Sequence, residues 1–448
     1  MLDPASASDA LASLIDQARR AGADAADAVY VGDRSTSVGV RMGALEDVSR
    51  AEGQEIGLRL FVGQRNAAVA SSDLSRDSLG ALVERALAMA REAPEDQYAG
   101  LAPDEFLMSG DRAELDLDDG GDPDPAALRQ RAEAAEDAAR SVAGITNSNG
   151  GSASATASTF ALATSHGFVG ASRATGYSCS ASVVAGHGSG MQRDYGWHSA
   201  RHLSDLEQPE DIGRRAGERA AARLNPMRVK AGPMPILFDA RVATTLLGHF
   251  IGAISGGAIT RQSSFLLDAL GTQVFARGVT IHDDPSRPRG LRSRSFDGEG
   301  LPVAASDLVA DGVLTGWLAD SAAARQLGIA PTGHAVRGVS GSPGAGPSNL
   351  VMQPGERSRE AMIAGIRNAI LVTELIGQGV NGVTGDYSRG AAGFLIVNGE
   401  IGPAVSEITI ASNLKTMFAE LEPASDLTLR RGIDSPTLLV PQMMVASA

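Results

Sequence analysis

The sequence predicts an α+β protein of two domains: antiparallel strands and helices in the N-terminal one, and an antiparallel β barrel or sandwich with a few helices in the C-terminal one. Short runs of alternating apolar and polar residues, separated by glycines, predict antiparallel strands. No long alternation of strand with helix occurs, which argues against a parallel sheet. Asn225-Pro226 follows a helical stretch and precedes a new strand, so the predicted domains are 1–225 and 226–448.

The N-terminal domain opens with an amphipathic helix over 8–21, whose leucines and isoleucine recur at helical spacing. A second helix is predicted from Ser75 to about Arg91, with Ser75 or Asp77 as its cap. Glycines 32, 43, 53 and 63 separate the extended runs between these helices. The predicted strands are Ala25–Val31, Thr36–Arg41, Glu46–Arg50, Glu55–Phe61 and Ala67–Ser71.

An acidic stretch broken by proline and glycine follows over 94–125. Its aspartates at 116–124 miss the EF-hand spacing and lack the closing Glu, so a solvated surface loop is predicted rather than a calcium loop. A third helix is predicted over 125–143. Strands rich in Ser, Thr, Ala and Gly are then expected over 147–185, followed by a helix over 211–224.

The C-terminal domain begins with a strand over 234–238 and a helix that Asp239 caps, with apolar residues at helical spacing. Gly256-Gly257 is expected to end this helix before the polar run 260–264. Gly338–Pro347 is expected to be a mobile loop. The other predicted elements are strands at 279–282, 303–305, 313–318, 350–352, 369–374, 393–397, 405–409, 427–429, 438–440 and 443–446, and helices at 321–327 and 412–420.

Composition excludes several classes of function. The net charge of -14 and the absence of a Lys/Arg cluster argue against nucleic acid as a partner. The single cysteine, Cys179, excludes an intramolecular disulfide framework and fits a reducing compartment. Neither a signal peptide nor an apolar run of membrane-spanning length is found, so we expect no membrane association and a cytoplasmic location.

Two groups of residues are candidates for chemistry. His282 beside Asp283 could form a catalytic dyad, although a strand-end turn with satisfied polar groups is the commoner outcome. The glycine-rich run 373–394 allows close backbone approach, and between its glycines stand Asp386, Tyr387 and Arg389. We expect these three to form a surface that pairs with another chain.

Five segments together resemble the TldD/PmbA family, once called modulators of DNA gyrase, and specifically its PmbA (TldE) branch. They are MQRDYGW, LLGHFIGAISGGAITRQSSFLLDALG, TIHDDPSRPRGLRSRSFDGEG, TELIGQGVNGVTGDYSRGAAGF and VSEITIASNLKTMF. The resemblance covers nearly the whole chain. It implies an N-terminal α/β part, a C-terminal antiparallel β barrel-like part, and a cytoplasmic TldD–PmbA complex that cleaves unfolded peptides.

The same resemblance implies a zinc site in the TldD branch, where a helix carries H-E-x-x-x-H and a cysteine near the C-terminus supplies a third ligand. In this chain the first His is His249, but the Glu is replaced by Phe250 and the second His by Ile254. No cysteine follows Cys179. Because catalytic zinc needs about three protein ligands, we expect no zinc and no other cofactor in this chain, and zinc in a TldD-type partner.

The resulting hypothesis is a scaffold subunit that presents unfolded peptide to a TldD-type partner by strand addition. The candidate peptide contacts are Arg261, Gln262, Ser263, Tyr387 and Arg389. One alternative is a noncatalytic peptide-binding homodimer that works without TldD. Another is a hydrolase with its own non-zinc site at polar residues such as His249, His282 and Asp283.

Overall fold

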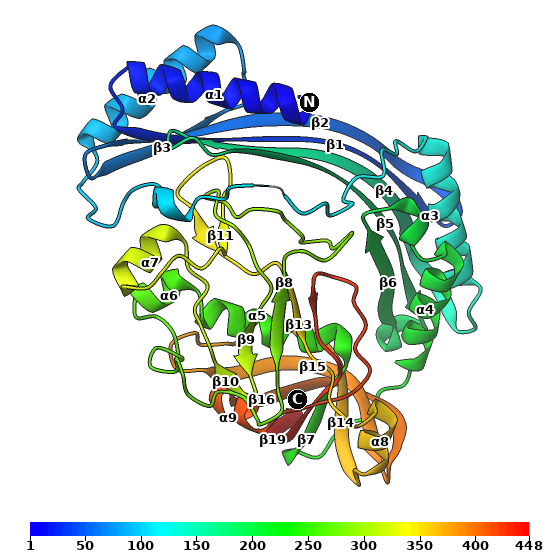
Figure 1. The fold of residues 1–448 in the computed structure, drawn as a ribbon. Helices are drawn as coiled ribbons and strands as arrows, with labels where there is room; N and C mark the ends of the chain where they lie inside the picture. The colour runs from blue at the N-terminus through cyan, green and yellow to red at the C-terminus, as the bar shows by residue number, and fades with distance from the viewer. Residues whose placement is uncertain (111, 448) are drawn as a thin grey trace.

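The N-terminal half forms one antiparallel sheet of six long strands in the order β3-β2-β1-β4-β5-β6. The computed structural model describes residues 1–110 and 112–447. Figure 1 shows this sheet arching over the C-terminal half of the chain, with its helices on the outer face. The strands are β1 (Ala25–Arg41), β2 (Ala44–Val62), β3 (Arg65–Ser71), β4 (Ile145–Thr164), β5 (Val169–Ala185) and β6 (Gln192–Ala200).

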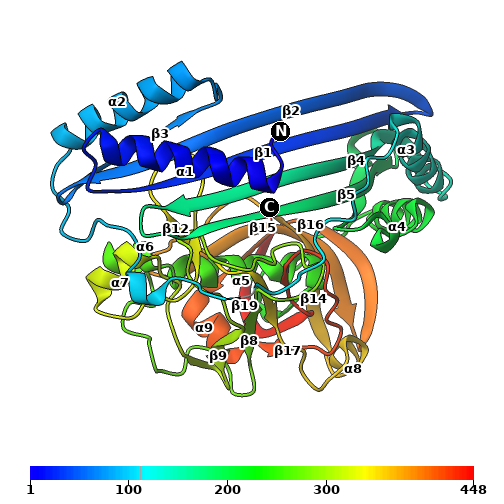
Figure 2. The ribbon, with the colours of Figure 1, turned by 45° about the horizontal axis from the view of Figure 1, so that its top comes forward.

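Two pairs of helices cover the outer face of this sheet, and Figure 2 shows the first pair lying along the strands. α1 and α2 pack on a core of apolar side chains from β1 and β2, and the small side chains of β4 and β5 allow α3 and α4 to pack closely. Asp3, Ser75 and Asp124 cap the first three helices through their side chains. The helices are α1 (Pro4–Arg20), α2 (Arg76–Glu92), α3 (Pro125–Arg140) and α4 (Pro209–Ala222).

The observed strands are longer than predicted, because not every glycine in the sequence ends a strand. Gly32 and Gly53 stay within the ladder, where Gly32 pairs with Gln54 and Asp33 with Gly53, so the four runs predicted between Ala25 and Phe61 are in fact two strands. Gly43 and Gly63 do turn the chain, and both have positive φ. A glycine ends a strand only where the backbone needs positive φ, and sequence alone does not distinguish the two cases.

The C-terminal half contains a closed five-stranded barrel. Its strands follow the order β16-β15-β14-β7-β19, and β19 pairs back with β16. Every pair in this ring is antiparallel except β14 with β7. These findings confirm the α+β class with a barrel-like C-terminal domain. The barrel strands are β7 (Gly232–Phe238), β14 (Asn368–Ile376), β15 (Asp386–Val397), β16 (Glu400–Asn413) and β19 (Leu438–Ser447).

A smaller five-stranded sheet shares its hydrophobic core with the barrel and with helix α5. The short strands are β8 (Ile281–Asp284), β9 (Ser306–Ala310), β10 (Val313–Leu314), β11 (Ala335–Val336), β12 (Gly344–Ala345), β13 (Asn349–Met352), β17 (Glu422–Pro423) and β18 (Ile433–Asp434). The helices of this half are α5 (Ala240–Ala253), α6 (Gly256–Thr260), α7 (Ser321–Leu327), α8 (Arg359–Ala364) and α9 (Leu414–Glu420). Among the described residues no helix has the length and apolar character needed to cross a membrane.

Several predicted boundaries in this half are wrong. Gly256-Gly257 starts α6, because Gly256 N–H donates to the Leu318 carbonyl and fixes a second helical turn after α5. Residues 303–305 and 427–429 are not strands. The predicted loop Gly338–Pro347 contains β12, which pairs with β11. These short elements depend on partners far along the chain, which local periodicity does not reveal.

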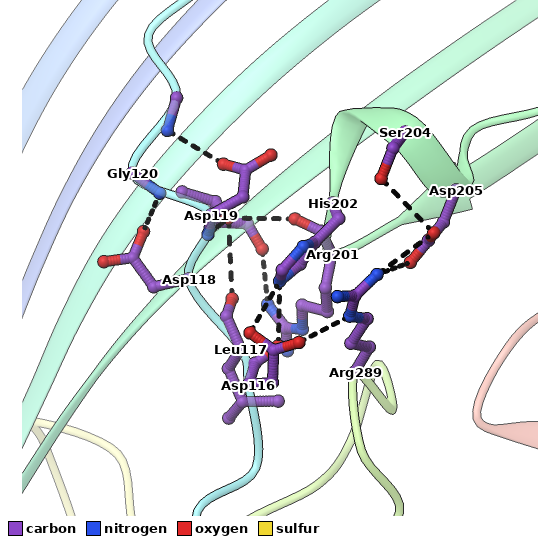
Figure 3. Close-up of polar contacts among 12 residues, drawn as sticks. Asp116, Leu117, Asp118, Asp119, Gly120, Arg201, His202, Ser204, Asp205 and Arg289 are labelled. Atoms are coloured by element: carbon purple, nitrogen blue, oxygen red, sulfur yellow. Dashed lines mark hydrogen bonds and ion pairs between the residues drawn. The ribbon is translucent and has the colours of Figure 1, made fainter.

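The acidic connection before α3 was predicted to be a solvated loop, but its aspartates form hydrogen bonds and ion pairs with other parts of the chain (Figure 3). Asp119 accepts hydrogen bonds from the Tyr177 hydroxyl at 2.6 Å and from Leu203 N–H at 3.0 Å. Asp116 accepts one from Arg289 of the C-terminal half at 2.6 Å. These aspartates therefore attach the connection to both halves of the molecule.

Candidate functional site

Helix α5 presents one buried face and one open face. Its N-cap is the predicted one, since the Asp239 carboxylate accepts a hydrogen bond from Arg241 N–H at 3.1 Å. Leu246, Leu247 and Phe250 face the core. Gly248 lies exposed on the other face, and a side-chain atom added there would meet nothing within 4 Å. The helix therefore offers an open surface directly beside His249.

His249 lies half-buried at the end of this surface and contacts Tyr387 of β15. The two rings meet edge to face, with their centroids 6.0 Å apart and an interplanar angle of 81°. Both His249 Nε2 and the Tyr387 hydroxyl are buried, and neither has a hydrogen-bond partner in the described part of the chain. Burial lowers the pKa of His249, and the nearby Arg389 guanidinium lowers it further. The imidazole is therefore neutral at pH 7 and keeps unused hydrogen-bonding capacity.

The other two positions of the family's metal motif belong to the core. Phe250 and Ile254 are fully buried, and Phe250 packs edge to face on Phe275 at 5.2 Å between ring centroids. Across residues 1–110 and 112–447, no three His, Cys, Asp or Glu side chains converge as metal ligands. His249 instead has a phenol and a guanidinium as neighbours, and a cation repels a divalent metal. These residues do not fit a zinc site.

Tyr387 and Arg389 are not on an open surface, which corrects the expectation from their glycine-rich surroundings. Their side chains are buried, with Tyr387 1% exposed and Arg389 8% exposed. The preceding segment folds back over β15, because Ser388 N–H donates to the Gly379 carbonyl and Val380 pairs with Tyr387. The glycines allow this self-contact.

The second group of predicted peptide contacts lies elsewhere. Arg261 and Gln262 are exposed at the end of α6, where Gln262 has a positive φ of 54°. The Ser263 hydroxyl donates to the Ala258 carbonyl at 3.3 Å. Within the described part of the chain, no hydrogen bond or ion pair joins these residues to Tyr387 or Arg389. The chain directly after Ser263 nevertheless meets the segment that precedes Tyr387, since Phe265 N–H donates to the Gly382 carbonyl at 2.9 Å.

His282 and Asp283 do not form a dyad with each other. His282 Nδ1 lies 2.7 Å from Asp307 Oδ1, whereas the buried Asp283 carboxylate lies 3.4 Å from His334 Nε2. Adjacent residues of β8 point to opposite faces of the sheet, so each finds its own partner. Neither contacts His249 among the described residues.

A groove of about 280 Å³, the α5 groove, runs between β6 and α5. Tyr195 and Asp194 of β6 line one wall, Arg241 and Thr244 of α5 line another, and Arg389 lies in the lining as well. Arg241 joins the two walls by donating to both carboxylate oxygens of Asp194, at 2.7 and 2.9 Å. Burial would raise the pKa of Asp194, but Arg241, the Tyr195 N–H and Arg223 together outweigh burial and hold the pKa below its ordinary value.

Sequence reasoning missed the role of β6 in this groove. A signal existed, since MQRDYGW places Arg, Asp, Tyr and Trp within seven residues, but neither spacing nor periodicity indicates that this strand faces α5. The ion pair between Asp194 and Arg241 spans the Asn225-Pro226 connection. Such long-range charge pairing is visible only in three dimensions.

Comparison with known proteins gives a consistent result. Family models match residues 26–90 (PmbA/TldA metallopeptidase domain 1), 118–224 (central domain) and 231–447 (C-terminal domain). The chain is 37% identical to metalloprotease PmbA of Escherichia coli O157:H7 over 94% of this chain and 92% of the relative.

Solved structures share the fold. A candidate modulator of DNA gyrase from Bacteroides thetaiotaomicron superposes with a TM-score of 0.91 at 27% identity, covering 98% of each chain. TldE from Thermococcus kodakarensis gives a TM-score of 0.87 at 21% identity, covering 98% of this chain and 100% of TldE. From the three matched domains and the level of identity, the chain belongs to the PmbA/TldD metallopeptidase family, in its PmbA (TldE) branch.

Proposed function

We propose that this chain is the peptide-holding subunit of a cytoplasmic two-component metallopeptidase whose zinc lies in a TldD-type partner. The observation that carries the proposal is the surroundings of His249. The first ligand position of the family motif keeps its imidazole, while the other two positions are core residues, Phe250 and Ile254. Chemistry that needs a metal-activated water must then come from another chain.

The α5 groove supports the peptide-holding role. Among the described residues β6 pairs only with β5, so its other edge has no strand partner. Two of its carbonyls, those of Arg193 and Tyr195, already accept side-chain hydrogen bonds from Arg223 at 3.1 Å and Arg219 at 3.5 Å, so a peptide strand that pairs with these carbonyls must displace the two arginines. An extended peptide that adds to a sheet edge gains affinity from its backbone and needs little sequence specificity, as the substrate of a general peptidase requires.

The central test is reconstitution. The chain and the TldD-type protein of the same organism are purified together and separately, and cleavage of an unfolded peptide is measured for each sample. We expect a stable complex that cleaves the peptide and no cleavage by this chain alone. Full activity of this chain without its partner, or failure of the two proteins to associate, would contradict the proposal.

A pair of variants tests which side chains act. His249→Gln should leave the complex largely active, because His249 serves neither as general base nor as metal ligand in this proposal. If His249 were a catalytic base, its loss would lower the rate about 10²–10⁴-fold. Arg389→Ala should weaken cleavage mainly through KM, because Arg389 lines the α5 groove and can hold a peptide carbonyl.

Both variants are compared with the wild-type complex in steady-state assays, with assembly checked by sedimentation. Inactive His249→Gln beside a normal Arg389→Ala would return the chemistry to this chain.

A further inference from the structure

A second cavity, the arginine pocket, continues the α5 groove at the N-terminus of α5. It has a volume of about 230 Å³ and shares Tyr195, Arg241, Thr244 and Arg431 with the groove. Six arginines and three aspartates line it, so its lining carries three more positive than negative charges. Glu207 and Asp194, which are not in the lining, pair with three of these arginines, so the cluster holds six arginines and five carboxylates in a chain whose net charge is -14.

Most of the charged groups in the arginine pocket are already paired. Arg215 and Arg430 both bind Glu207, Arg241 binds Asp194, and Arg359 binds Asp239 at 3.2 Å.

The remaining aspartates are used by backbone and hydroxyl donors. Asp426 accepts from Thr437, and Asp434 accepts from the N–H groups of residues 430–432. These contacts leave two of the six arginines without a carboxylate.

Arg219 and Arg431 are those two arginines. In the part of the chain that the structure describes, neither makes a salt bridge, and each donates only to a carbonyl, of Tyr195 at 3.5 Å and of Arg241 at 3.1 Å respectively. Burial lowers the pKa of both groups, and the nearby Arg241 lowers that of Arg219 further. Asp239 and Asp194 act on Arg219, and Asp434 acts on Arg431, only from a distance, so both guanidiniums are partly desolvated without a direct ion pair among the described residues, a situation that an anion would relieve.

Aromatic rings lie against two arginines of the pocket, Arg431 and Arg241. The Arg431 guanidinium lies over the Trp197 ring at 5.0 Å, and Arg241 lies over the Tyr195 ring at 5.6 Å. A guanidinium stacked on a ring face keeps its N–H donors in its own plane, where they can form paired hydrogen bonds with a planar carboxylate. The pocket thus presents oriented donors beside an apolar wall.

We infer that the arginine pocket binds a carboxylate of the peptide substrate, either its C-terminal group or an acidic side chain, through Arg219 and Arg431. The inference rests on the proposed function, since it assigns one end of a peptide that lies along the α5 groove. The volume of the pocket accommodates a carboxylate with one side chain. A peptide extending from it passes Arg241 and Thr244 toward Arg389.

Calorimetric titration of the purified full chain tests the inference with three unlabelled peptides of one neutral sequence. The first has a free C-terminus, the second is amidated, and the third is amidated but carries one Glu. We expect at least one of the two carboxylate-bearing peptides to bind about tenfold more tightly than the neutral amide, with the advantage reduced at high salt. The peptide that gains affinity identifies which carboxylate is bound.

Variants then locate the site. Arg219→Ala and Arg431→Ala should each remove most of the carboxylate advantage, while Arg219→Lys, which keeps the charge and loses the paired donors, should restore part of it. The matched control is Arg214→Ala on the same helix as Arg219, because Arg214 is exposed and its one ion pair among the described residues is with Asp211. Circular dichroism confirms that each variant is folded.

The outcomes separate the two proposals. Equal binding of all three peptides overturns the inference while leaving the peptide-holding role intact, and binding of none of them overturns both. A carboxylate advantage that survives in both alanine variants, or disappears equally in Arg214→Ala, also overturns the inference.

Discussion

Two of the charged contacts between the N-terminal half and the C-terminal half differ in how completely their charges are matched. At the closed contact, Asp27 lies between Arg59 and Arg337, and Glu299 is close enough to act on both guanidiniums. At the arginine pocket, Arg219 and Arg431 form no ion pair with a carboxylate of residues 1–110 or 112–447. The first contact is a sealed structural joint, whereas the second keeps free capacity for an anion.

The closed contact is almost completely removed from solvent. The side chain of Asp27 is 5% exposed and that of Arg337 is 0% exposed. Burial alone would raise the pKa of Asp27, but the two guanidiniums outweigh it and hold the pKa below its ordinary value. The approach is so close that an added side-chain atom at Gly57 would lie 1.8 Å from the Val339 carbonyl oxygen. This joint requires glycine and matched charges at once.

The difference shows where the fold has used charge for stability and where it has not. A buried ion contributes to stability only when its partners satisfy it, and a buried uncompensated ion is destabilising. The closed contact meets that condition. The arginine pocket does not, because two of its cations are half-buried and unmatched, and this pattern is typical of binding sites rather than of structural joints.

The largest effect should come from breaking the closed contact. Asp27→Asn keeps the shape of the side chain but leaves Arg59 and Arg337 buried without their carboxylate, so we expect a loss of about 3–5 kcal/mol in the free energy of unfolding. Arg219→Ala in the arginine pocket should change it by less than about 1 kcal/mol, since it removes one weak hydrogen bond and places alanine in a helix. Urea unfolding measures both.

Equal losses in the two variants would remove the distinction between a structural joint and a binding site. So would a strongly destabilised Arg219→Ala beside an unaffected Asp27→Asn. The exposed pair of Arg34 with Asp122 supplies a baseline, because removing Asp122 should have little effect.

The pH dependence of stability tests the closed contact at Glu299. Burial raises its pKa from the model-peptide value of 4.5 to about 7, while its hydrogen bond to Ser321 N–H and the charge of Arg59 oppose the rise. A carboxyl whose pKa is higher in the folded state stabilises the fold below its unfolded pKa and loses that contribution as pH rises through the folded pKa. Wild-type protein should therefore lose stability from this group between about pH 4.5 and 7.

Glu299→Gln removes that titration and retains an oxygen acceptor for Ser321. Its free energy of unfolding, relative to wild type, should increase by on the order of 3 kcal/mol between pH 4.5 and pH 8. A difference between the two proteins that stays constant across this range would show that Glu299 titrates normally. Glu299 would then be ionised above its ordinary pKa, and the closed contact would bury a second carboxylate beside Asp27.

Much of this architecture follows from local sequence patterns. Asp239 and Ser75 cap helices as expected, and the apolar spacing in α5 correctly identifies its buried face. The errors occur where tertiary pairing decides the outcome. Gly32 stays in a strand because β2 and β4 pair with it on both sides, and Gly256 starts a helix because Leu318 accepts its hydrogen bond.

The site was less predictable than the fold. The motif position His249 was identified from the family resemblance, but its contact with Tyr387 joins residues 138 positions apart in the chain. The walls of the α5 groove come from β6 and α5, which lie on either side of Asn225-Pro226. Residue type and spacing along the chain carry no information about such pairs, which depend on how the sheet arches over the barrel.

The smallest effect is expected at Gly248, on the open face of α5, and it tests whether a peptide binds along this face. Gly248→Ala adds one methyl group where nothing lies within 4 Å, so it should raise the free energy of unfolding by about 0.5–1 kcal/mol through helix propensity. Gly248 lies one turn beyond Thr244, which lines the α5 groove. If a peptide lies along this face, the same methyl group should weaken its binding several-fold, as measured by calorimetry.

Gly80→Ala provides the matched control, because Gly80 lies inside α2 on the outer side of the sheet and also has open space around it. Both variants should gain stability by the same helical mechanism, but only Gly248→Ala should lose peptide affinity. Loss in both, or in neither, would mean that the peptide does not lie along α5. If Gly248→Ala alone raises the free energy of unfolding and weakens peptide binding, then Gly248 keeps the α5 groove open and lowers the stability of the helix.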